Sequence, residues 1–234
     1  MIFKTKNKII DNALHLNLNG IEIQKVDNVK FLGVIIDSQL SWKYHVNYIS
    51  GKISRIIGTL CRVKDILPQK ILVGLYYSMI LPHLTYGICV WGHCSNYLLQ
   101  KLFLLQKRAL RVITNSYYLA HTEPLFAKLE ILPLHVLYNF HIAVFMYMVT
   151  KQLIPVSFDK FIYRHSINNY SCRNSHELYI PFYRYEVSRA SLGYQGPQIW
   201  NGLSKNLQES PSLVTFKRKL KIALQHEKDV KNVK

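Results

Sequence analysis

Acidic residues are scarce in this chain. Its 234 residues include 30 Lys and Arg but only 13 Asp and Glu, which gives a formal net charge of +17. Charged residues make up 18% of the sequence and hydrophobic residues 49%, a composition that excludes a disordered polyelectrolyte and suffices for one sizeable core or two small ones. The excess of positive charge indicates a polyanionic partner, either nucleic acid or an anionic membrane surface.

Cysteines are also few: the chain has four, with no Cys-x-x-Cys spacing. Scattered cysteines in a chain of this length indicate free thiols in a reducing compartment. One alternative is a zinc site built from Cys89, His93 and Cys94 together with Cys172 and His176, but nothing in the sequence brings the two groups together. The first twelve residues lack the apolar segment of a signal peptide, so we expect an intracellular protein, nuclear or cytoplasmic.

Catalytic motifs are absent. Polymerases and nucleases hold two metal ions with neighbouring carboxylates, yet no two aspartates adjoin and no Asp-x-Asp or Asp-x-Glu occurs. Asp37 follows a β-like run, where a metal ligand could lie, but we expect it to cap the next segment instead. No GxxxxGK[ST], GxGxxG or GxSxG motif is present either. We therefore expect no catalytic residue, no metal site and no small-molecule substrate in this chain.

Two stretches lack charge altogether, residues 71–100 and 131–150. Each is long enough for a spanning helix, which needs about 20 residues. Both contain proline and several His or Asn, which are costly in hydrocarbon. We favour buried helices of an all-α core, which makes a membrane an unexpected partner, and keep a two-span membrane protein, using residues 71–99 and 131–149, as the alternative.

Local patterns predict two kinds of element. Residues 14–18 and 21–23 alternate apolar and polar around Asn19-Gly20, which predicts a β hairpin. Residues 29–36 form a β-branched apolar run, long enough for one buried strand. Six helices are predicted. The first begins just after Trp42 and reaches Leu60, the second runs from Pro68 to Pro82, and the third covers residues 97–113. A short fourth helix begins at Glu123, the fifth covers residues 134–149, and the last begins at Pro211.

The predicted fold is therefore mainly α. A short N-terminal antiparallel hairpin or strand precedes an antiparallel helical bundle, and a loop-rich α+β tail follows, with a short hairpin around residues 178–180 and 191–194. The expected division is residues 1–40 for the β segment, 41–150 for the bundle and 151–234 for the tail with its basic final helix.

Basic side chains and aromatic rings are the remaining candidates for function. Lys and Arg neutralise phosphates, and rings stack on bases. The alternative for each group is a solvated basic helix face, or rings that belong to the core. The helical candidates are Lys52, Arg55, Lys101, Lys107, Arg108, Arg111, Lys217, Arg218, Lys219 and Lys221, and Tyr183, Arg184, Tyr185 and Arg189 interleave rings with guanidinium groups.

Nine short segments follow one another in a characteristic order along the chain. The first is FLGVIID at residues 31–37, and YGICVWG at residues 86–92 is another. In this order they resemble the C-terminal part of a jockey-like non-LTR retrotransposon reverse transcriptase, and the resemblance covers roughly residues 1–224. The others are residues 40–45, 105–113, 121–126, 129–132, 170–173, 196–201 and 216–221.

The resemblance implies specific roles. In that family the FLGV segment is the counterpart of the primer-grip hairpin, so Phe31, Leu32 and Gly33 would hold the primer 3′ end. Gly33 has a local alternative, a simple strand kink. The helices that follow would be the thumb, which rides on the RNA–DNA primer–template duplex.

The family's metal-binding aspartates, with their Mg²⁺, are expected upstream of this chain. The resemblance therefore implies a fragment of an RNA-directed DNA polymerase that needs no cofactor and does not polymerise alone. The alternative is a degenerate transposon-derived product without selected function. The sequence does not indicate an oligomeric state.

Overall fold

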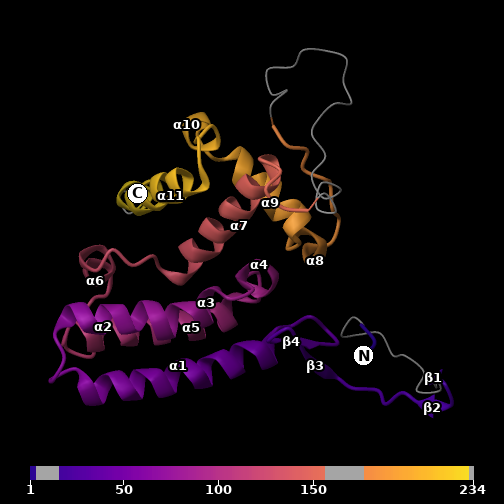
Figure 1. Cartoon of the computed structure of the whole chain (residues 1–234), viewed down its shortest axis with the longest axis horizontal. Coiled ribbons are helices and arrows are strands. Elements are labelled where there is room, and N and C mark those ends of the chain that lie inside the picture. Colours follow the sequence, from indigo (N-terminus) through magenta and orange to yellow (C-terminus); the bar gives the residue numbers. More distant parts are fainter. Residues whose placement is uncertain (4–15, 156–176, 232–234) are drawn as a thin grey trace. The chain divides into compact units, whose positions relative to one another are not determined.

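The computed structural model describes residues 1–3, 16–155 and 177–231, with only the backbone described for residues 186, 187 and 226–231. The chain divides into two compact units. Unit 1 comprises Met1–Leu84 and Cys94–Ser116, and unit 2 comprises Thr85–His93 and Tyr117–Lys234. The described elements are mostly helices, preceded by two N-terminal β hairpins, which confirms the mainly α prediction (Figure 1). The predicted division at residues 40 and 150 stays a prediction.

The first hairpin of unit 1 joins β1 (Asn17–Leu18) to the antiparallel β2 (Ile21–Glu22). Its turn residues Asn19 and Gly20 have φ values of 49° and 82°. A type I′ turn needs positive φ at both positions, and Asn-Gly is the pair that meets this need most easily. The predicted hairpin is confirmed for the described residues, and residues 14 and 15 lie outside them.

The second hairpin pairs β3 (Asn28–Phe31) with β4 (Val34–Asp37), so the prediction of one buried strand over residues 29–36 is wrong. Phe31 pairs directly with Val34, and the turn between them consists of Leu32 and Gly33, with φ values of 44° and 83°. Gly33 has no Cβ and adopts this conformation without strain. The turn was hidden in the sequence because leucine, rather than Asn or Asp, occupies its first position.

The β3–β4 hairpin is fastened to the helix that follows, α1 (Lys43–Val63). The Asp37 carboxylate accepts backbone N–H bonds from Gln39 (3.1 Å), Ser41 (3.0 Å) and Trp42 (2.8 Å). Asp37 therefore caps the segment that enters α1, as predicted. A second fastening comes from His45, whose Nδ1 accepts the Ile35 N–H at 3.3 Å.

Three helical segments make up the rest of unit 1. The first is α1. The second is continuous from α2 (Gln69–Leu75) through the π-helical η1 (Tyr76–Ile80) to α3 (Leu81–Thr85), and the third is α5 (Asn96–Ile113). Pro82 has no N–H to continue the ordinary ladder, and the turn before it is widened, with Leu81 N–H donating to Tyr76 O five residues back. These helices confirm the predictions for this region.

Helices α1 and α5 run parallel (Figure 1). Near their N-terminal ends Lys101 Nζ donates to Asn47 Oδ1 at 2.7 Å, and beyond their C-terminal ends Lys64 Nζ donates to Asn115 Oδ1 at 2.7 Å. The α2–α3 run connects them along the chain and packs against both, while α1 and α5 also contact each other directly, as in an up-down-up bundle. The buried residues shared by the three segments include Ile53, Ile57, Leu60, Leu72, Tyr76, Ile80, Leu102 and Leu110.

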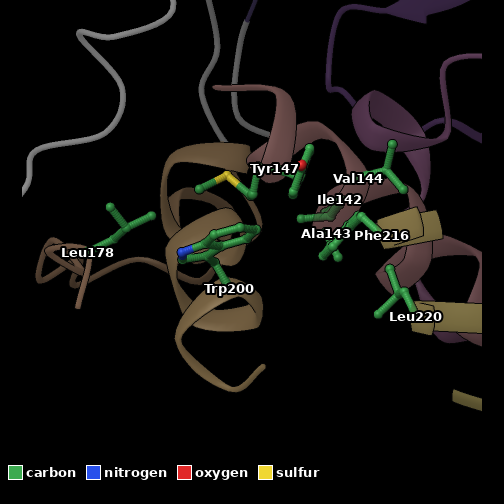
Figure 2. Close-up of a cluster of buried hydrophobic side chains, with 9 residues drawn as sticks. Ile142, Ala143, Val144, Tyr147, Leu178, Trp200, Phe216 and Leu220 are labelled. Carbon is green, nitrogen blue, oxygen red and sulfur yellow. The ribbon is translucent and has the colours of Figure 1, made fainter. Parts of the chain in front are cut away.

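Unit 2 is built around α7 (Leu134–Thr150), with α9 (Leu192–Asn201) and α11 (Leu213–Lys231) packed on it. Figure 2 shows the buried side chains that these helices share. The Tyr147 ring stacks on Phe216 with 4.5 Å between centroids, and Tyr147 Oη donates to Ser210 O at 2.7 Å. The other helices are α4 (Ile88–Trp91), α6 (Glu123–Lys128), α8 (Glu186–Arg189) and α10 (Lys205–Gln208).

The predicted helices from Glu123, over residues 134–149 and from Pro211 are confirmed by α6, α7 and α11. The predicted hairpin in the tail is wrong, because residues 192–194 begin α9. Gly196 and Pro197 are residue types common in turns, yet both are buried inside this helix, and a Cβ on Gly196 would meet Met146 Sδ at 2.6 Å. The glycine serves close helix packing rather than a turn.

No helix within residues 16–155 and 177–231 is long and apolar enough to cross a membrane. Residues 71–99 are divided among α2, η1, α3, α4 and the start of α5, and α7 has 17 residues. This finding contradicts the two-span alternative.

Two glycines provide a matched test of packing. A Cβ at Gly92 would meet the Tyr138 ring and, at 2.5 Å, the Ile88 carbonyl oxygen, whereas a Cβ at Gly74 has nothing within 4 Å. We expect Gly92→Ala to lower the free energy of unfolding by about 1–3 kcal/mol. Gly74→Ala should raise it by about 0.5–1 kcal/mol, because alanine suits a helix better. Urea unfolding followed by circular dichroism measures both, and changes of the same sign would contradict this packing.

The buried His45 predicts acid sensitivity. The side chain is 2% exposed, and burial lowers its pKa from 6.5 to about 4. Between these pH values the unfolded chain binds a proton that the folded chain does not. The free energy of unfolding should therefore fall by up to about 3 kcal/mol as the pH drops from 6.5 to 4.

The variant His45→Asn isolates this effect from that of the other histidines, because asparagine keeps an acceptor near the position of Nδ1. The wild type's stability relative to this variant should shrink as the pH falls from 7 to 4, in urea titrations at several pH values. A difference that stays constant over this range would rule out the assignment to His45.

Candidate nucleic-acid interface

The three predicted primer-grip residues meet at the tip of the β3–β4 hairpin. Phe31 is 60% and Leu32 75% exposed, so the tip presents apolar side chains to solvent. Leu32 also has the left-handed conformation, which costs an ordinary residue roughly 1–2 kcal/mol. Strained and exposed residues of this kind concentrate at functional sites. Gly33 supplies a tight bend, and the primer-grip role of the three stays a prediction.

The outward face of α1 carries no negative charge. No Asp or Glu occurs in the helix, and its charged residues are two Lys and two Arg. The exposed Arg55 lies between the exposed Gly51 and Gly58 on one face, and a Cβ on either glycine would have nothing within 4 Å. Arg55 Nε donates to Gly51 O at 3.3 Å, which holds the guanidinium along this strip.

Helix α5 likewise has four Lys and Arg and no Asp or Glu, but the structure spreads them over more than one face. Lys101 lies on the flank next to α1, where it donates to Asn47. Arg108, two turns further on, shares that flank and is exposed. Lys107 lies elsewhere, with Nζ 4.4 Å from the centroid of the Phe103 ring, and Arg111 is half-buried.

One cationic cluster of unit 1 includes residues that the sequence analysis missed. Lys30 Nζ of β3 lies 3.4 Å from Tyr48 Oη and 5.1 Å from the centroid of the Tyr48 ring. Lys52 Nζ of α1 lies 4.7 Å from the same centroid. The hydrogen bond from Lys52 and then that from Lys30 lower the pKa of Tyr48. We call Lys30, Tyr48 and Lys52 the lysine–tyrosine cluster.

His83 of α3 lies beside this cluster, and burial, together with the Lys52 charge, lowers its pKa. Among the cluster's residues the sequence analysis singled out only Lys52. The spacing of Tyr48 and Lys52 at i and i+4 of a helix was visible, whereas Lys30 joins them only because residues 28–37 fold as a hairpin.

The basic candidates near the C-terminus belong to unit 2. Lys217, Arg218 and Lys219 are exposed on α11 and Lys221 is half-buried. His141 of α7 is close enough to Lys217 that the lysine, after burial, lowers its pKa. The predicted basic residues therefore form separate groups, one on α1 and α5 in unit 1 and one on α11 in unit 2.

The aromatic and arginine residues before α9 are only partly available for stacking. Tyr185 is 70% exposed, but Tyr183 is half-buried and packs on Tyr194 with 6.2 Å between ring centroids. Arg184 is exposed, and Arg189 Nε is bound to Tyr183 O at 2.9 Å.

Metal ligands do not gather in the described part of the chain, where no group of three His, Cys, Asp or Glu could hold an ion. Cys61, Cys89 and Cys94 are free thiols, and burial raises the pKa of Cys89 and of Cys94 to about 11. The second half of the suggested zinc site, at Cys172 and His176, lies outside the described residues.

No protein-family model matches the chain, and no solved structure matches it significantly. Several known proteins do match the chain in sequence. The chain is 28% identical over 120 residues to the RNA-directed DNA polymerase from mobile element jockey of Drosophila melanogaster, a match that covers 50% of this chain and 13% of that protein.

The corresponding jockey polymerase of Drosophila funebris is 26% identical over 135 residues, covering 55% of this chain and 15% of that protein. A probable RNA-directed DNA polymerase from transposon BS of Drosophila melanogaster is 24% identical over 106 residues, covering 44% and 12%. The matches thus span well under a fifth of these relatives' own lengths. The predicted resemblance is confirmed: about half of the chain is similar to the RNA-directed DNA polymerases of jockey-like non-LTR retrotransposons.

Proposed function

We propose that the chain is the palm-edge, thumb and C-terminal part of such a polymerase, and that unit 1 binds an RNA–DNA primer–template duplex. The observation that carries this proposal is the parallel pair α1 and α5, whose charged residues are all Lys or Arg, four on each helix. Ordinary surface helices mix both signs of charge, and an uncompensated basic surface favours a polyanion.

Binding of this kind acts through phosphates and is independent of sequence. Each phosphate that a Lys or Arg neutralises releases condensed counterions, so affinity falls steeply as salt rises. The up-down-up bundle supports such contacts because its buried core holds α1 and α5 in fixed register, through Lys101–Asn47 and Lys64–Asn115. A rigid pair of basic helices would present its charges to the phosphates of a duplex at fixed positions.

The β3–β4 hairpin supplies the second part of the proposal. Phe31, Leu32 and Gly33 would contact the end of the primer strand through their exposed turn. The hairpin's fixed link to α1, through Asp37 and His45, would hold that contact at a constant distance from the basic helices.

The second candidate, a transposon-derived product without selected function, is favoured by one observation. The two hairpins expose many apolar side chains, among them Leu18 (64%), Ile21 (72%) and Leu32 (75%). Two-stranded sheets with exposed apolar faces are marginally stable alone and prone to association. Such surfaces fit a segment that packs on further protein, so poor solubility of the isolated chain would favour this candidate.

Charge reversal on α1 and α5 tests the interface. We expect Arg55→Glu combined with Arg108→Glu to weaken binding of an RNA–DNA duplex by at least tenfold at about 100 mM salt. The slope of log affinity against log salt should flatten by about two, since two phosphate contacts are lost. Fluorescence anisotropy with a labelled primer–template at several salt concentrations measures both quantities.

The control carries the same charge change on unit 2, at Lys128→Glu of α6 combined with Lys205→Glu of α10, both exposed. Binding should change much less in the control. Equal losses in the two double variants would show a general charge effect and sink the interface.

The proposal also includes inactivity of the chain alone. With an annealed primer–template, deoxynucleotides and Mg²⁺ or Mn²⁺, we expect no primer extension, because a two-metal centre needs paired carboxylates. Extension by a preparation free of other polymerases would contradict this part of the proposal while leaving the duplex interface standing.

A further inference from the structure

Two lysines from different elements converge on one phenol in unit 1. Lys30 of β3 and Lys52 of α1 both place Nζ against Tyr48, at 5.1 Å and 4.7 Å from its ring centroid. A ring face or a phenol oxygen attracts one ammonium group, but two ammonium groups on the same ring repel each other. The arrangement is therefore more favourable when an anion lies between them.

No protein carboxylate supplies that anion among the described residues. Lys30 and Lys52 form no ion pair with an Asp or Glu in this part of the chain, and the side-chain contacts of both are with Tyr48. His83, whose pKa is lowered by burial and by the Lys52 charge, supplies no negative charge either. The acidic residue closest in sequence to Lys30, Asp27, stands before β3, and Asp37 is committed to three backbone N–H groups.

Regular elements of unit 1 hold the lysine–tyrosine cluster in place. Tyr48 and Lys52 are one turn apart on a regular helix, and Lys30 is brought to them by the hairpin that Asp37 and His45 fasten to α1. Lys30 stands directly before Phe31, the first residue of the exposed hairpin tip. An anion bound here would lie next to whatever the tip contacts.

We propose that Lys30, Tyr48 and Lys52 bind one phosphate group of a nucleic-acid backbone. The two ammonium groups would each donate to a phosphate oxygen, and the Tyr48 hydroxyl would donate a third hydrogen bond. Charge-assisted bonds of this kind are short and about twice as strong as neutral ones. The site rests on the proposed function, and it fixes which strand position is held: the phosphate nearest the tip of the β3–β4 hairpin.

The first experiment compares double variants of the full chain. Lys30→Gln combined with Lys52→Gln should weaken binding of the RNA–DNA primer–template five- to tenfold and flatten the salt slope by about one, as expected for one phosphate contact. The control, Lys70→Gln combined with Lys205→Gln, removes the same charge from exposed sites on α2 and α10 and should leave the slope unchanged. Equal slopes in the two variants would overturn the site while the proposed function stands.

The second experiment observes the phenol directly. In a chain labelled with ¹³Cζ-tyrosine, the Tyr48 resonance is identified by its loss in Tyr48→Phe. The two lysines lower the pKa of Tyr48, so an anion that neutralises them should raise it. Inorganic phosphate and the duplex are added separately, which distinguishes a free anion from a backbone phosphate.

A rise of the Tyr48 pKa with the duplex supports the site. A rise with inorganic phosphate alone overturns a nucleic-acid role for the site and leaves only a general anion site. No rise with either overturns the proposal. If the wild-type chain binds no duplex at all, the proposed function fails, and the inorganic phosphate titration still decides whether an anion site exists.

Discussion

The candidate nucleic-acid interface depends on the hydrogen bonds that the Asp37 carboxylate accepts. This side chain is 4% exposed, and a buried carboxylate is tolerable only when its oxygens are satisfied, here by three backbone N–H groups. The segment that it organises contains Leu40 and Trp42 in left-handed conformations, at roughly 1–2 kcal/mol each. Hydrogen bonds to a charged group contribute about 1.5–3 kcal/mol each, which offsets that strain. The chain can therefore turn sharply from β4 into α1 and keep the hairpin in a fixed orientation.

A surface with one sign of charge works against folding. The repulsion among the Lys and Arg of α1 and α5 destabilises the compact state, and the buried side chains between the three helical segments must outweigh it. A bound polyanion removes this repulsion and binds the folded state in preference to the unfolded one, so binding and stability are linked. In unit 1 the apolar core thus provides the rigidity, and the proposed polyanionic partner would offset the cost of the basic surface.

Local rules predicted the parts of this fold that local chemistry determines. Asn19-Gly20 indicated a hairpin, Asp37 a cap, and the apolar spacing in α1 and α5 two amphipathic helices. The errors arose where a residue acts through distant contacts. Leucine at position 32 has no local preference for a turn. Residues 191–194 were placed in a hairpin although they lead into α9, which Gly196 allows to approach Met146.

The candidate site followed the same division. Lys52, Arg55 and the basic residues of α5 were visible because a helix displays its charges at known intervals. Lys30 was missed because only the β3–β4 register, with Lys30 opposite Ile35, and the fastening to α1 bring it to Tyr48. Tyr48 was not singled out although it lies one helical turn before Lys52. The relatives support the resemblance to jockey-like RNA-directed DNA polymerases, but they do not assign these residues a role.

Gly51 and Gly58 extend this reasoning to features that the fold itself does not explain. Each costs about 1 kcal/mol of helix propensity relative to alanine, and neither is needed for packing, because a Cβ would meet nothing within 4 Å. Packing within unit 1 therefore does not explain these two glycines. Bare backbone on either side of Arg55 lowers the surface of α1 where the guanidinium lies, so a bulky partner can approach the helix closely. A duplex whose backbone is neutralised by Arg55 and the lysine–tyrosine cluster is a partner that would use such a strip.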